Sequence, residues 1–172
     1  LFPYTTLFRS IGWVHIIYQP FTAEETLLCR AEAELYLGKR EEALADLNAW
    51  TTSKQVTASL TQTNINNFYA GTRIADYAGE LNPQKMSSQF VQLEGDDLSI
   101  LYCILHFRRI ETMFEGLRWF DIKRYGIEIP RRVCGANGNP TKIIDWLRVD
   151  DPRRAIQIPQ KVRQGGLQAN PR

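Results

Sequence analysis

The stretch FRRIETMFEGLRWFDIKRYG, residues 107–126, decides the fold prediction because charged and aromatic residues recur in it at helical spacing. Upstream of it, apolar residues recur every three or four positions, and Asp96 and Asp97 favour a helix start. Gly126 ends the pattern, and a proline four residues later prevents its continuation. We therefore predict one long helix over 97–125, the signature helix, whose core-facing stripe is Ile100, Ile104, Phe107, Ile110, Phe114 and Leu117.

A second helical region precedes it, over residues 22–52. Thr22 is a good N-cap and Glu25 follows three residues later, as in a capping box. The small side chains of Ala31 and Ala43 allow two helices to approach closely, and Gly38 between them suits a left-handed helix end. This is the spacing of a tetratricopeptide unit, with an ordinary helical hairpin as the alternative. Either way, an antiparallel helical hairpin is expected.

The remaining segments have weaker patterns. Residues 53–95 are rich in Thr, Ser, Asn and Gln, which predicts an irregular surface insert with one helix near 61–68. The tail over 126–172 predicts extended pieces, a short strand or packed loop at 143–147, and one helical turn. The fold class predicted is thus all-α: a tetratricopeptide-like helical hairpin plus the long signature helix, with an irregular insert and an extended C-terminal tail.

The composition of the chain narrows the classes of function that we expect. The chain of 172 residues is 44% hydrophobic and 23% charged, with a formal net charge of +2 and no basic run, so nucleic acid is not an expected partner. No apolar stretch is long enough to span a membrane. Cys29, Cys103 and Cys134 lie far apart without a CxxC pair, which predicts neither a metal site nor a disulfide framework, and no cofactor is expected.

The first ten residues differ from the rest. LFPYTTLFRS, residues 1–10, looks like the translation of a widely used sequencing adapter in one reading frame. We therefore exclude it from the fold prediction. We expect residues 11–172 to be the C-terminal part of a longer protein, whose beginning would carry any signal peptide or lipid anchor.

The charges of the signature helix predict a structural role. Pairs of opposite charge one turn apart stabilise a helix only slightly when exposed, but buried charges need partners. We predict a partly buried network that fixes this helix against the tail, with a solvated charged face as the alternative. Its expected members are Arg109, Glu111, Glu115, Arg118 and Asp121.

Residues 107–126 also resemble the late signature of the SusD/RagB family, an arginine pair, an acidic residue, Phe-Glu-Gly and an R-W-F-D-x-x-R run. The residues that carry this resemblance are Arg108, Arg109, Glu111, Phe114, Glu115, Gly116, Arg118, Trp119, Phe120, Asp121 and Arg124. The tail over 151–172 is similar to the family's terminus, with an isoleucine-proline pair and an Asn-Pro ending. Phe107 and Thr112 depart from the family pattern at positions that concern packing and ion pairing.

The resemblance implies a surface-exposed lipoprotein of the cell outer membrane, held there only by a lipid anchor that this sequence lacks. It would capture an oligosaccharide or peptide and pass it to a TonB-dependent SusC-type transporter, without being an enzyme. Sugars stack on aromatic rings and pair with amide and charged side chains. The insert residues expected to bind are Asn67, Tyr69, Arg73 and Tyr77, with anchoring of an irregular loop as the alternative role of each.

Two other functions compete with capture. The first is an intracellular tetratricopeptide-type scaffold for protein interactions, which would need several similar repeats where the sequence has one. The second is a glycosidase, which needs two facing carboxylates, one of them protonated. Glu111 and Glu115 lie side by side with arginines next to both, which favours ionised groups. We therefore predict no catalytic residue.

Overall fold

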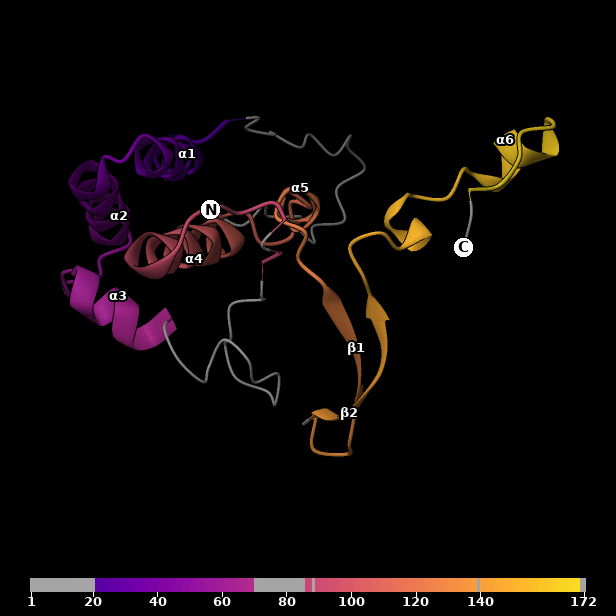
Figure 1. The fold of residues 1–172 in the computed structure, drawn as a ribbon. Coiled ribbons are helices and arrows are strands. Elements are labelled where there is room, and N and C mark those ends of the chain that lie inside the picture. The colour runs from indigo at the N-terminus through magenta and orange to yellow at the C-terminus, as the bar shows by residue number, and fades with distance from the viewer. Residues whose placement is uncertain (1–20, 70–85, 88, 139, 171–172) are drawn as a thin grey trace, which may run out of the picture.

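The computed structural model describes residues 21–69, 86–87, 89–138 and 140–170, and these form helices followed by a β-hairpin and a tail (Figure 1). The segment 1–10, interpreted above as a translated adapter, lies outside the described residues. The elements are α1 (Ala23–Tyr36), α2 (Arg40–Ser53), α3 (Gln62–Tyr69), α4 (Gly95–Glu111), α5 (Arg118–Arg124), β1 (Ile129–Cys134), β2 (Pro140–Leu147), the 3-10 helix η2 (Pro152–Arg154) and α6 (Gln160–Gln164).

Helices α1 and α2 form at the positions that the caps and small residues predict. The Thr22 hydroxyl accepts a hydrogen bond from the backbone N–H of Glu25 at 3.1 Å, which satisfies one of the free donors at the start of α1. Gly38 ends the turn after α1 with φ +75°, a conformation that a side chain disfavours. Ala31 and Ala43 are fully buried where the two helices pack together.

Helix α4 is the centre of the core, since α1, α2 and α3 all pack against it. Its residues Ile100 and Ile104 are fully buried. The rings of Trp50 in α2 and Phe107 in α4 stack with centroids 4.4 Å apart. Each aliphatic side chain removed from water in this way contributes about 1.5–3 kcal/mol, so the packing on α4 is the main stabilising feature of the helical region.

The predicted single helix over 97–125 is wrong, because the structure divides it into α4 and α5. Phe114 and Gly116 between them have φ values of +69° and +79°, which no right-handed helix accommodates. The predicted stripe therefore faces the core only in its first half. Ile110 is 46% exposed and Phe114 is 94% exposed, because the chain leaves the helix axis at residue 112.

The all-α fold class is also wrong, because β1 and β2 form a two-stranded antiparallel sheet. Ile129 pairs with Leu147 and Arg131 with Asp145, and two irregularities interrupt the register further along. The physical reason is visible in the sequence around the Gly/Asn-rich turn at 135–138, which has β-branched residues on both sides. No tetratricopeptide repeat is shown in the part of the chain that the structure describes.

The hairpin and tail are fastened to the end of α5. Buried Arg154 donates to four backbone carbonyls, those of Arg148 and Ile127 at 2.6 Å, Ile122 at 3.2 Å and Leu147 at 3.3 Å. These carbonyls belong to the end of α5, the start of the hairpin and its exit. Beyond this point the tail with α6 extends away from the helices (Figure 1).

Candidate functional site

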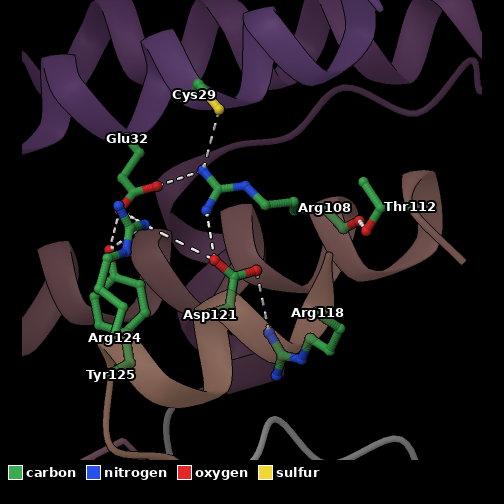
Figure 2. A network of polar contacts seen from close by, with 8 residues as sticks. All are labelled: Cys29, Glu32, Arg108, Thr112, Arg118, Asp121, Arg124 and Tyr125. Atoms are coloured by element: carbon green, nitrogen blue, oxygen red, sulfur yellow. Dashed lines mark hydrogen bonds and ion pairs between the residues drawn. The ribbon is translucent and has the colours of Figure 1, made fainter. Parts of the chain in front are cut away.

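Among the described residues, buried charges gather around Arg108 in α4, which is only 7% exposed. Its guanidinium donates to Oδ1 of Asp121 in α5 at 2.8 Å and to Oε2 of Glu32 in α1 (Figure 2). It also lies 3.8 Å from the sulfur of Cys29. Arg108 therefore joins three helices through charge-assisted hydrogen bonds. We call Glu32, Arg108 and Asp121, together with Arg118, Arg124 and Tyr125 around them, the buried network.

The second carboxylate oxygen of Glu32 also accepts hydrogen bonds. Its Oε1 atom receives hydrogen bonds from the guanidinium of Arg124 and the hydroxyl of Tyr125, both at the end of α5. Burial acts to raise the pKa of Glu32, but the charge of Arg108 and the hydrogen bonds from its donors outweigh it, so the pKa lies below its ordinary value. Arg118, 3.7 Å from Asp121, completes the buried network.

Local sequence explains why these side chains meet. Asp121, Arg124 and Tyr125 are spaced by three and four residues, so they share one face of the last helical turn before Gly126. At Gly126 φ is +58°, and a Cβ atom would approach the Phe90 ring to 2.6 Å, so the chain must turn there with glycine. The break before α5 and the turn after it hold that face against α1.

The buried network is suited to holding helices rather than to acid–base chemistry. A general acid needs a carboxyl group that stays protonated, whereas Glu32 has a lowered pKa and two arginine partners. Burial lowers the pKa of Arg118 to about 10, which still leaves a cation at neutral pH. Among the described residues, no group of three or more His, Cys, Asp or Glu side chains is placed to hold a metal ion.

The structure brings together only part of the predicted network. Asp121 and Arg118 belong to the buried network, but its central arginine is Arg108, whereas Arg109 is exposed. Glu115 is exposed in the break between α4 and α5. The helices are held against α1, not against the tail, because Glu32 is the shared acceptor.

Glu111, predicted for the same network, binds elsewhere. Its Oε2 atom accepts from the indole N–H of Trp50 at 2.9 Å and lies 2.8 Å from the ammonium of Lys54. Trp50 belongs to α2, and Lys54 is the residue that caps its C-terminal end. Glu111 thus attaches the end of α4 to the end of α2, at a place separate from the buried network.

The sequence contained a signal for Arg108 that the prediction did not use. Ile100, Ile104 and Arg108 are spaced by four, so Arg108 continues the buried stripe while Arg109 is rotated about 100° away from it. Glu32 follows the buried Ala31 and gave no comparable signal, since a mid-helix glutamate is usually exposed. Its partner lies 76 residues away.

The predicted ligand-binding residues do not form one described site. Asn67 is exposed on α3, whereas Tyr69 is 4% exposed and its hydroxyl hydrogen bonds with Nδ1 of His106 at 2.8 Å. Burial raises the pKa of Tyr69, in keeping with a core position. Arg73 and Tyr77 lie outside the described residues. For Tyr69, the structure favours the alternative of an aromatic that anchors α3 to α4.

Comparisons with known proteins add no relative. No model of a known protein family, no curated protein and no solved structure matches the chain. Within the described ranges, every helix is too short or too polar to cross a membrane.

Proposed function

We propose that this chain is part of a nutrient-binding component of an outer-membrane uptake system. It captures an oligosaccharide or peptide at the cell surface and passes it to a TonB-dependent SusC-type transporter. The observation that carries the proposal is the run of residues 107–126, whose resemblance to the SusD/RagB signature is long and specific.

The surroundings of these residues support capture without catalysis. In the buried network, Arg108 and Asp121 of the run hold α4 and α5 on Glu32 of α1. These signature residues therefore hold helices together, a role that a ligand-binding protein of this fold would require. Hydrolysis of a glycan would require two facing carboxylates with a protonated member, and neither Glu32 nor its arginine-rich surroundings offer one.

The experiment that tests the proposal begins with the complete reading frame and its neighbouring genes, recovered from the source DNA. The proposal predicts a lipoprotein signal with its cysteine and an adjacent gene for a TonB-dependent transporter. When the two proteins are produced together with affinity tags on only one, they should be purified as a complex. A reading frame without a signal that continues into further tetratricopeptide repeats would contradict the proposal.

Ligand capture has its own readout in the same complete protein. Binding to an oligosaccharide array should identify a ligand, and Asn67→Ala should weaken its binding about fivefold, the size of one lost hydrogen bond. Thr63→Ala, one turn earlier on the exposed side of α3, is the matched control and should leave affinity unchanged. Equal effects of both substitutions would remove Asn67 from the binding surface.

A further inference from the structure

The tail is closed into a loop by its own side chains. The Gln157 carboxamide oxygen accepts from the backbone N–H of Asn170 at 2.9 Å, and its NH2 group donates to the Asn170 carbonyl at 3.2 Å. In return, the Asn170 side chain donates to the carbonyl of Ile156 at 2.7 Å. Residues 155–170, which we call the tail loop, therefore have a defined shape without support from the helices.

The surface of the tail loop is apolar and cationic. None of the residues of α6 is buried, and Ile156, Val162 and Leu167 are 83%, 43% and 57% exposed. Lys161 and Arg163 are the only charged residues between 155 and 170. A preordered loop that exposes aliphatic side chains beside two cations has the features of a surface that binds an acidic, partly apolar partner.

The opposite end of the molecule has the complementary character. At the turn between α1 and α2, Tyr36 is 46% exposed and Leu37 is 73% exposed. Glu41 and Glu42 are exposed in the first turn of α2 directly after it. We call these four residues the turn patch. Lys39, next to these residues, has the same sign of charge as the tail loop and opposes the contact. Arg40 is already paired with Asp97 at 2.7 Å, so its charge is balanced within the molecule.

The two surfaces cannot meet within one molecule in this fold. Figure 1 shows α6 at the far end of the molecule from α1 and α2, with the β-hairpin and the core helices between them. We propose that the tail loop of one copy binds the turn patch of a second copy, in a head-to-tail contact. Such a contact is heterologous, so it leaves a free tail loop and a free turn patch at the two ends of every pair.

Sedimentation velocity of the purified chain, from micromolar to near-millimolar concentration, tests this inference. At an ionic strength of about 0.05 M the average mass should rise steadily with concentration, and at about 0.5 M the rise should largely disappear because salt screens exposed charges. Lys161→Glu with Arg163→Glu, the loop variant, should weaken association at least about tenfold. Glu41→Lys with Glu42→Lys, the patch variant, should do the same.

Mixing the two variants distinguishes this contact from non-specific association. Each variant alone pairs like charges at this contact, whereas the acidic loop of one and the basic patch of the other are complementary, so an equimolar mixture should regain the association that neither variant shows alone. Lys142→Glu, at an exposed site of β2, is the control and should leave association unchanged. A wild-type chain that stays monomeric at every concentration, or association that survives both charge reversals, would overturn the inference.

Discussion

Arg108 and Arg153 each lie between two carboxylates, in very different surroundings. Arg108 joins Glu32 and Asp121, and all three side chains are less than 10% exposed. Arg153 joins Asp145 and Asp151 beside the hairpin, and its side chain is 36% exposed. The first set connects three helices, whereas the second spans only nine residues of one chain segment.

The difference shows that burial, not the type of ion pair, decides what such a group contributes. At Arg153, water reaches the guanidinium and the carboxylate of Asp145, although hydrogen bonds from Arg153 lower the pKa of Asp151 to about 2. At Arg108, water cannot replace a lost partner, so an uncompensated buried charge would remain. The buried network is therefore expected to be necessary for folding, and the exposed set dispensable.

The largest effect should come from Arg108→Ala. It leaves Glu32 and Asp121 buried without their shared partner, which should lower the free energy of unfolding by about 3–5 kcal/mol in urea titrations followed by circular dichroism. Arg109→Ala, the exposed neighbour, is the matched control and should change stability by less than about 0.5 kcal/mol. Similar losses for the two variants would remove the distinction between buried and exposed arginines.

The adjacent residues Arg153 and Arg154 test the same distinction within the tail. Arg154→Ala removes all four hydrogen bonds from a buried guanidinium to backbone carbonyls, which should cost about 2–3 kcal/mol. The loss should appear first as faster hydrogen exchange in β1 and β2, because these strands lose their attachment to α5. If exchange accelerates equally throughout α4, Arg154 supports the whole fold rather than the hairpin.

Acid should weaken the buried network before it weakens the helical packing. The pKa of Glu32 is lowered in the folded chain, so its contribution is complete above the ordinary glutamate pKa of about 4.3 and is lost as pH falls through the lower folded value. Glu32→Gln should lower stability at pH 7 and flatten this acid dependence. If the stability of the variant falls with decreasing pH as steeply as that of the wild type, other carboxylates cause the acid dependence.

The smallest effect should come from Arg153→Ala. The side chains of Arg153 and Asp145 are 36% and 37% exposed, so water can solvate the groups that are left, and the midpoint of urea unfolding should remain within error of the wild type. Adding salt to the wild type should likewise have little effect on unfolding of the helices. A large loss of stability would show that the hairpin set is as important as the buried network.

The parts of the fold that the sequence predicts well depend on neighbours in the chain. The N-cap at Thr22, the left-handed Gly38 and the small Ala31 and Ala43 act within a few residues, and α1 and α2 form where these features place them. The break at Phe114 was not predicted, because helical periodicity continues through it and only the φ value reveals the turn.

The parts that depend on distant residues were harder to predict. The partner of Arg108 is 76 residues away, and nothing near Glu32 marks it as buried. Of the two alternatives for residues 143–147, the strand is the one observed, within β2, but its pairing with β1 was not predicted. Pro130 and two adjacent arginines hide the alternation of β1, and the register of the hairpin is irregular. Half of the predicted binding residues lie outside the described residues, so only Asn67 and Tyr69 can be placed.

A double-mutant cycle between Glu32 and Arg108 tests most directly whether the signature-like residues hold the helices together. Unfolding of the wild type, Glu32→Gln, Arg108→Met and the double variant would give their coupling energy, with a cycle of Asp145→Asn and Arg153→Met for comparison. We predict coupling of about 2 kcal/mol or more in the first cycle and none beyond error in the second. Absence of coupling between Glu32 and Arg108 would contradict a structural role for the buried network.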